Sequence, residues 1–246
     1  MRAEIIPIGD ELLLGIVKEE TSYHIIKFLT ENGVRVERVT IIPDNKREIV
    51  DAIRRALKKG IEIIVTSGGL GPTEDDMTVD AVAEALNRNV VINSTLAKRI
   101  NTECKAFKER ALRMARVIEN SKMFLSPFGF APAQLIKESN SYIILLPGPP
   151  KEAIALFKQI FNEIKNPNKC LKAFRKRIYL RKREAEIADF INMISRKYNV
   201  YIKPLVAEHS EELGLPVEIL AFCADRDEFN KRVKEILSAF SQRNLL

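Results

Sequence analysis

The sequence lacks any long apolar run, since no stretch approaches the roughly 18 consecutive apolar residues that a membrane span requires. Its first residues, Met1-Arg2-Ala3-Glu4, lead into a brief apolar strand without a small-residue cleavage site, which argues against a secretory signal. Only three cysteines occur, Cys104, Cys170 and Cys223, and their wide separation matches no metal-ligand spacing. We therefore expect reduced thiols and a cytoplasmic protein.

Histidine is scarce in the whole sequence and glycine is scarce in residues 149–246, which argues against two further kinds of functional site. The two histidines, His24 and His209, stand in settings that offer no Ser–His–Asp or Cys–His arrangement. Residues 149–246 contain a single glycine, Gly214, so a backbone-gripping GxxG loop of the RNA-binding KH type does not exist there. Nucleic acid is therefore an unfavoured partner. Nine Lys or Arg and no acid from Lys165 to Arg183 form either a surface that steers anions or a solvated face.

The residues that are present are typical of a soluble globular protein, with 46% hydrophobic and 30% charged side chains in 246 residues. Up to Asn87, apolar strands alternate with amphipathic helices. Asn45 followed by Glu48 is a variant capping box ahead of a helix that Gly60 ends. Three strand–helix units in succession predict a parallel sheet with helices on both faces.

Each of these strands ends in residues suited to a ligand. The first ends at Gly9-Asp10-Glu11, the second at Pro43-Asp44 and the third at the turn Ser67 to Asp76. Because ligands of open α/β sheets bind beyond the carboxyl ends of the strands, these segments should meet at one edge.

The turn after the third strand carries the most specific pattern. Gly68, Gly69 and Gly71 let backbone N–H groups approach a ligand, and a helix opening at Thr78 adds donors that suit a phosphate. Asp75 and Asp76 are hard oxygen ligands of the kind that Mg²⁺ prefers. The alternative is a glycine turn followed by acids that merely favour a helix N-terminus.

The rest of the chain predicts further elements. We expect a strand near 90–92, one long helix over 95–117, a hairpin or irregular arm over 123–137, a strand over 142–146 and a helix over 151–164. Pro147-Gly148-Pro149-Pro150 is either a second anion contact or a rigid turn. After a linker at Asn166-Pro167-Asn168, strands over 173–180, 200–207 and 216–223 and helices over 184–197 and 226–240 predict a small α+β domain.

These motifs resemble those of the competence/damage-inducible CinA family, whose first domain belongs to the molybdopterin-binding (MoaB/Mog-like) group of molybdenum cofactor biosynthesis. The resemblance rests on Ile8 to Gly15, Pro43-Asp44, Ser67 to Asp80, Pro127 to Pro132 and Leu146 to Glu152. It implies a three-layer α/β/α sandwich over residues 1–165 and a small KH-like α+β domain over residues 170–246. The family's C-terminal amidohydrolase domain has no counterpart in this sequence, so we expect that activity to be absent.

The resemblance also implies a reaction at a phosphoanhydride. We expect a divalent-metal-dependent nucleotide pyrophosphatase acting on ADP-ribose or a similar dinucleotide; the alternatives are a molybdopterin adenylyltransferase and a non-catalytic pterin- or nucleotide-binding module. Mg²⁺, Mn²⁺ or Co²⁺ would be the cofactor, and a homo-oligomer is expected. The catalytic residues are then Asp44 and Asp76, and the metal ligands Asp44, Asp75 and Asp76. The expected ligand-binding residues are Gly9, Asp10, Glu11, Ser67, Gly68, Gly69, Gly71, Pro72, Thr73, Ser126, Pro147 and Gly148.

Three positions depart from the family pattern. Thr21 and Ser126 stand where the family usually has Asn, and Ala133 stands where it usually has Gly. Thr and Ser lose the paired donor and acceptor of an amide. Catalysis is therefore less firmly implied than binding.

Overall fold

The computed structural model describes residues 1–104, 108–127, 129–165 and 171–246, so the predicted linker Asn166-Pro167-Asn168 and Cys170 lie outside the described residues. The chain divides into two compact units. The first comprises Met1–Leu29 and Val34–Lys165, and the second comprises Thr30–Gly33 and Asn166–Leu246. No helix in the described parts of the chain is long and apolar enough to cross a membrane.

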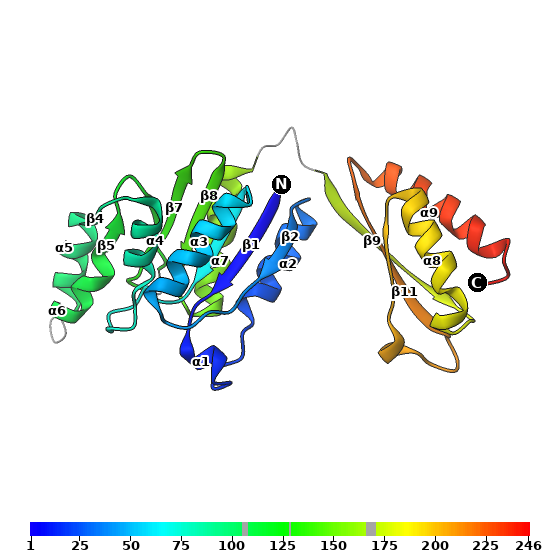
Figure 1. Ribbon diagram of the computed structural model, residues 1–246, viewed down its shortest axis with the longest axis horizontal. Helices are drawn as coiled ribbons and strands as arrows, with labels where there is room; N and C mark the ends of the chain where they lie inside the picture. The colour runs from blue at the N-terminus through cyan, green and yellow to red at the C-terminus, as the bar shows by residue number, and fades with distance from the viewer. Residues whose placement is uncertain (105–107, 128, 166–170) are drawn as a thin grey trace. The chain divides into compact units, whose positions relative to one another are not determined.

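The first unit is built on a six-stranded sheet in the order β2-β1-β3-β8-β7-β6 (Figure 1). Its parallel part consists of β1 (Arg2–Pro7), β2 (Arg35–Val39), β3 (Ile63–Ser67) and β8 (Ser141–Leu146). At the other edge, β7 (Ala133–Glu138) and β6 (Lys122–Phe124) run antiparallel, so of the two alternatives predicted over 123–137 the chain forms the hairpin.

Helices cover both faces of this sheet. On one face, Ile63 and Val65 of β3 pack in a buried cluster with side chains of α2 (Thr21–Glu31) and α7 (Pro150–Ile164). Ile64 of the same strand packs in the cluster that holds α3 (Lys46–Lys58) and α4 (Thr78–Leu86). A strand buried on both faces favours apolar residues at successive positions, which explains the Ile-Ile-Val run ahead of the buried Thr66 and Ser67. The predicted three-layer α/β/α sandwich is confirmed.

Local signals fix several boundaries where they were expected. The Asn45 side chain accepts hydrogen bonds from the Arg47 and Glu48 N–H groups and begins α3. Asn87, with φ of 52°, ends α4 in the left-handed conformation. A short helix, α1 (Asp10–Leu13), follows β1.

The single long helix predicted over 95–117 is wrong. The structure has α5 (Ser94–Glu103), α6 (Lys108–Ala111) and a 3-10 turn, η2 (Leu112–Ala115), while part of the predicted helix lies outside the described residues. The chain then forms β5 (Arg116–Ile118), which pairs antiparallel with β4 (Val90–Ile92). This pairing buries Val117 and Ile118 and brings Arg116 to an ion pair with Asp80. Helical periodicity cannot reveal such a non-local pairing.

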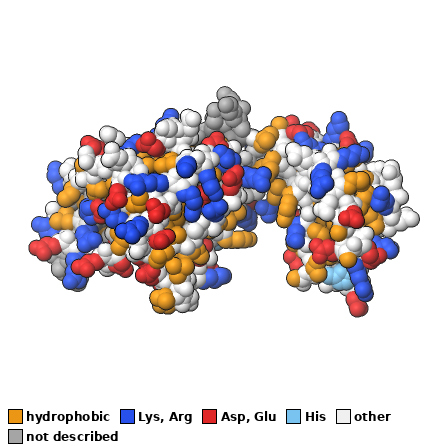
Figure 2. Space-filling view, viewed as in Figure 1, with side chains coloured by type: hydrophobic (Ala, Val, Ile, Leu, Met, Phe, Trp, Pro, Cys, Tyr) orange, Lys and Arg blue, Asp and Glu red, His pale blue; other side chains and the backbone are white. Residues whose placement is uncertain are grey.

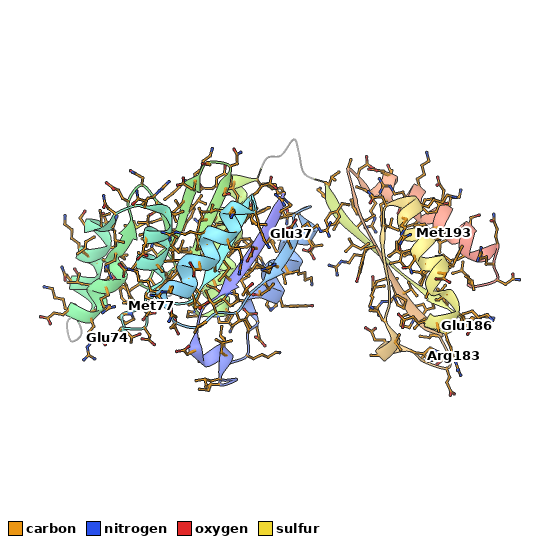
Figure 3. The ribbon with its side chains drawn as sticks, in the orientation of Figure 1. Glu37, Glu74, Met77, Arg183, Glu186 and Met193 are labelled. Atoms are coloured by element: carbon orange, nitrogen blue, oxygen red, sulfur yellow. The ribbon has the colours of Figure 1, made fainter. Side chains whose placement is uncertain are left out.

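The second unit has a three-stranded antiparallel sheet in the order β10-β11-β9. Its elements are β9 (Lys172–Leu180), α8 (Glu184–Tyr198), β10 (Tyr201–Pro204), η3 (Val206–Glu208), β11 (Leu215–Cys223) and α9 (Arg226–Ser241). Val217 and Ile219 pack against both helices in one core. At the start of α8, the Arg183 N–H donates to the Glu186 carboxylate, and both residues are labelled in Figure 3. The predicted α+β element order is confirmed, although the second strand stops at Pro204.

Candidate functional site

The glycine turn after β3 is tightly enclosed by the start of α4 and by the end of β1. Gly68 and Gly69 have φ values of 102° and 65°, which L side chains rarely adopt. A Cβ on Gly68 would lie 2.2 Å from the Ile8 carbonyl oxygen, and one on Gly69 would lie 2.2 Å from Thr78 Oγ1. Thr78 Oγ1 in turn donates to the Gly68 carbonyl at 2.9 Å. This backbone therefore requires glycine at both positions.

The Asp76 carboxylate holds the second half of the turn. It accepts hydrogen bonds from the Gly71 N–H at 2.6 Å, the Thr73 N–H at 2.8 Å and the Thr73 hydroxyl at 2.5 Å. Three donors on one carboxylate fix the path of the loop from Gly71 to Asp76. Asp76 thus has a positioning role within the chain itself.

Asp44 lies among other acids. Its Oδ2 accepts a hydrogen bond of 2.9 Å from the Asp10 N–H, which joins the loop after β2 to the loop after β1. Burial raises the pKa of Asp44 above its usual range; the Asp10 N–H lowers it, and the negative charges of Glu11, Asp10 and Asp75 raise it further. A carboxylate in this setting gains stability from a nearby cation.

The strand-end loops meet at one cavity of about 500 Å³. Five carboxylate residues line it, and no Lys or Arg is among its described lining residues. Its lining residues are Ile8, Gly9, Glu11, Asp44, Gly68, Gly69, Leu70, Gly71, Asp75, Asp76, Met114, Gly129, Phe130, Ala131, Pro147, Gly148, Pro149 and Glu152. The cavity therefore joins glycine-rich backbone to strong negative charge.

Most of the predicted site residues lie at this cavity. These are Gly9, Glu11, Asp44, Gly68, Gly69, Gly71, Asp75, Asp76, Pro147 and Gly148. Ser67 lines a smaller neighbouring cavity instead. In the described structure, Asp10, Pro72, Thr73 and Ser126 line neither cavity: Asp10 and Thr73 act through their bonds to Asp44 and Asp76, Pro72 is half-buried, and Ser126 is buried beyond the end of β6.

Among the lining residues that were not predicted as site residues, Met114 and Phe130 are large apolar side chains from outside the strand-end loops. Met114 comes from η2, and Phe130 comes from the segment between β6 and β7, with the Arg99 guanidinium 5.0 Å from the centre of its ring. No spacing in the sequence links these residues to the strand ends. The signal that was available is indirect, since Phe130 lies within Pro127 to Pro132, a segment that carries part of the family resemblance.

The N-terminus of α7 also faces the cavity, through Pro149 and Glu152. Among the described side chains, none caps this 15-residue helix. Its first residue, Pro150, has no N–H, so the first donors it offers are the N–H groups of Lys151 and Glu152. An uncapped helix N-terminus favours an anion.

A divalent cation fits the donor chemistry of the cavity but has no complete protein cage there. Within the described ranges, no three His, Cys, Asp or Glu side chains are gathered closely enough to hold a metal ion. Mg²⁺ commonly takes one or two carboxylates, several waters and the phosphate oxygens of a ligand. Asp44, surrounded by Glu11 and Asp75, offers that kind of partial site.

Comparison with known proteins relates this chain to others of the same architecture. A family model described as a probable molybdopterin binding domain matches residues 4–166. A CinA-like protein from Thermotoga maritima is 31% identical over 240 residues, covering 96% of this chain and 58% of that protein. A CinA-like protein from Pseudothermotoga lettingae is 32% identical over 245 residues, covering 98% of this chain and 59% of that protein. The chain thus spans less than two thirds of these relatives.

A solved structure gives the same relationship at the level of the fold. The crystal structure of the protein CinA from Thermoplasma acidophilum superposes with a TM-score of 0.62 at 32% sequence identity. The match covers 67% of this chain and 98% of that one.

Proposed function

Because this chain belongs to the CinA family and carries a molybdopterin-binding domain over residues 4–166, we propose that it is a divalent-metal-dependent nucleotide pyrophosphatase. Its substrate class is a nucleoside diphosphate joined to a second organic group, such as ADP-ribose or FAD. Water would cleave the bond between one phosphorus atom and the bridging oxygen, leaving a nucleoside monophosphate and a second phosphomonoester.

The observation that carries this proposal is the charge of the cavity. Five carboxylate residues line it, without a Lys or Arg among the described lining residues, yet glycine backbone and the α7 N-terminus suit an anion. A bare diphosphate would be repelled by the carboxylates. A divalent cation between carboxylate and phosphate removes this conflict, and when bound it polarises phosphate oxygens and lowers the pKa of bound water.

In this proposal each residue of the cavity has its own role. Asp44 and Asp75 would hold the cation, and Glu11, whose negative charge acts on Asp44 and which lines the same cavity, would orient water or a phosphate ligand. Asp76 shapes the glycine turn through its three hydrogen bonds. Phe130 and Met114 offer apolar contact to a flat ring such as a nucleobase.

The test is release of AMP from ADP-ribose with Mg²⁺, Mn²⁺ or Co²⁺, measured for the wild type, Asp44→Asn and a matched control, Asp51→Asn. Asp51 is an exposed residue of α3 that does not line this cavity. We expect Asp44→Asn to lower kcat by about 10-fold or more, since even residues that only orient metal ligands have effects of about 10–100-fold, and Asp51→Asn to retain activity. Equal turnover in all three proteins would reject the proposal.

A second candidate follows from the family itself, whose model is that of a probable molybdopterin binding domain. The cavity would then bind a pterin, with adenylate transfer from ATP or without chemistry. Pterin-dependent release of pyrophosphate from ATP would support transfer. Pterin binding with neither pyrophosphate nor AMP release would identify a binding module.

A further inference from the structure

The sheet of the second unit has one face that neither α8 nor α9 covers. Both helices pack on the opposite face, where Val217 and Ile219 of β11 belong to the core (Figure 1). Successive side chains of a strand point to opposite faces, so the residues between these core positions point away from the helices. We call this the open sheet face; its central residues are Arg175, Tyr201, Lys203, Glu218, Leu220 and Phe222.

Aromatic and apolar side chains form a platform at the centre of the open sheet face. Tyr201 lies opposite Leu220 in the pairing of β10 with β11, and Phe222 is the next residue of β11 on the same face. Diagonal neighbours of this kind are about 7–8 Å apart in an antiparallel sheet, so the two rings lie side by side. Tyr201 is 61% exposed, and Leu220 and Phe222 are half-buried. Exposed ring faces of this kind suit a flat partner that stacks on them.

Two cations flank the platform. Arg175 stands on β9 at one edge of the sheet and Lys203 on β10 at the other edge. Both are exposed, and among the described residues neither forms an ion pair. Arg177, in contrast, is held by Glu218 at 2.7 Å and by Glu208 at 2.8 Å, so the acid at the centre of the face is already paired.

The strand at one edge adds to this positive charge. β9 has the sequence KAFRKRIYL, with four Lys or Arg and no acid, and it contains much of the basic run that the sequence analysis left open between an anion-steering surface and a solvated face. The unpaired cations beside the platform favour the first alternative, because they attract an anionic ligand to the rings.

The size of the open sheet face selects the kind of partner. Strands lie about 4.8 Å apart and residues on one face repeat about every 6.8 Å, so three short strands present about 300–400 Å². A stable protein–protein interface buries about 800 Å² on each partner. A second copy of the chain would therefore find too little surface here, whereas two or three stacked bases fit such a sheet.

We propose that the open sheet face binds single-stranded nucleic acid. Bases stack on Tyr201 and Phe222, and Arg175 and Lys203 neutralise the phosphates beside them. This mode of binding needs no GxxG loop, so the absence of that loop from residues 149–246, which argued against nucleic acid, does not exclude it. The inference goes beyond the proposed function and does not depend on hydrolysis or on the carboxylate-lined cavity.

The test is fluorescence anisotropy of labelled oligouridylate RNA and oligothymidylate DNA of about 12 nucleotides, titrated with the full chain at physiological ionic strength. We expect at least one of them to bind, and a duplex of the same length to bind about tenfold more weakly or worse, because paired bases are not free to stack. Tyr201→Ala should weaken binding of the single strand by about tenfold or more. Tyr201→Phe keeps the ring and should stay within about twofold of the wild type.

Lys203→Ala tests the charge argument. Its matched control is Lys234→Ala, which removes the same charge from an exposed position of α9, the helix on the opposite face of the sheet. Loss of one phosphate contact should flatten the slope of log Kd against log salt concentration by about 0.7 for a single strand. Lys234→Ala should leave that slope unchanged. Melting curves by circular dichroism show whether each variant is folded.

Several results would overturn the proposal. One is the absence of any anisotropy change with either oligonucleotide up to about 100 μM protein. Others are wild-type affinity in folded Tyr201→Ala, equal affinity for duplex and single strand, and equal salt slopes in Lys203→Ala and Lys234→Ala, which would indicate diffuse attraction to a basic protein. Sedimentation of the protein alone adds a last arm: a dimer that Tyr201→Ala disrupts would show that a second copy occupies the face instead.

Discussion

Asp44 shows how a single residue suited to binding a cation can lower the stability of the folded protein when no cation is bound. The fold raises the pKa of Asp44, so folding favours its protonated form. That contribution is present below the usual carboxyl pKa of 3.8 and is lost as the pH rises through the folded value. At pH 7 the ionised carboxylate therefore opposes folding. Asp44→Asn should raise the melting temperature at pH 7 by about 1–3 °C.

The gain should disappear in melts recorded below about pH 3, where the Asp44 carboxyl group is protonated in both the folded and the unfolded state. The amide oxygen that Asp44→Asn introduces still accepts from the Asp10 N–H, so no hydrogen bond is lost in this comparison. A melting temperature several degrees below that of the wild type at pH 7 would show that Asp44 is stabilised by partners rather than opposed by its acidic neighbours.

Whereas the ionised Asp44 carboxylate opposes folding, the Asp76 carboxylate is expected to stabilise the folded protein. Asp76→Ala removes the acceptor of three hydrogen bonds from Gly71 and Thr73, two of them backbone N–H groups. Hydrogen bonds to a charged acceptor contribute about 1.5–3 kcal/mol each, and part is recovered by water, so a loss of about 1.5–3 kcal/mol in total is expected. Urea unfolding measures it, with Glu74→Ala, an exposed residue of the same loop, as the matched control. A loss similar to that of Glu74→Ala would contradict the role assigned to Asp76.

At the scale of elements, the turn before α4 and the turn before α7 each contain a glycine, Gly69 and Gly148, whose substitution by Ala gives a matched comparison. Gly69→Ala places a Cβ 2.2 Å from Thr78 Oγ1 at a φ of 65°, so it should lower both stability and ligand binding. Gly148→Ala meets nothing closer than 3.9 Å, so the protein should keep its melting temperature. Gly148 lines the carboxylate-lined cavity, so the added methyl group would enter it and weaken the binding of ADP-ribose, which calorimetry would detect. Unchanged affinity in Gly148→Ala would place the ligand elsewhere.

Substitutions of Asn45, whose side chain caps the start of α3, would measure how much this local signal stabilises the protein. Asn45→Ala removes the acceptor for two backbone N–H groups and should cost about 1 kcal/mol of unfolding free energy. Asn45→Asp keeps a capping oxygen and should stay close to the wild type in the same denaturant titration. Equal losses in both variants would show that the cap contributes through something other than its side-chain acceptor.

Elements were predictable where local chemistry decides them. The continuous apolar run of β3, the Asn45 cap and the left-handed Asn87 all act within a few residues, so the sequence predicts these boundaries. The segment from α5 to β5 was not predictable, because its strand depends on pairing with Val90–Ile92 rather than on its own periodicity. Phe130 and Met114 were missed for the same reason, since only tertiary packing brings them to the cavity.

The meeting of the strand-end loops at one cavity was predictable, because parallel strands bring their carboxyl ends to one edge of the sheet. Loops after β1, β2, β3 and β8 contribute Glu11, Asp44, Gly68 and Gly148 to one cavity. The direction of each carboxylate was not predictable: the Asp76 side chain points into its own loop, a direction set by short-range hydrogen bonds.

On the space-filling view, apolar side chains gather at the tip near α1, where Leu13, Leu14 and Ile16 are exposed (Figure 2).

At the scale of the molecule, the two units have separate cores, and every residue lining both cavities belongs to the first. A chain truncated after Lys165 should therefore fold and bind ADP-ribose with a Kd within about twofold of that of the full chain, since a unit with its own hydrophobic core can fold alone. Circular dichroism would report folding and calorimetry the affinity. Loss of binding in a folded truncated chain would show that the second unit completes the site.

The central claim is that a carboxylate-lined cavity binds a diphosphate through a divalent cation. The most direct measurement is the Kd of the α,β-methylene analogue of ADP-ribose, whose phosphorus bridge water cannot cleave, with Mg²⁺ and with EDTA. We expect binding to be tighter by about tenfold or more with Mg²⁺, a difference of about 1.4 kcal/mol or more, and this advantage to be lost in Asp44→Asn. An equal Kd in Mg²⁺ and EDTA would contradict the account.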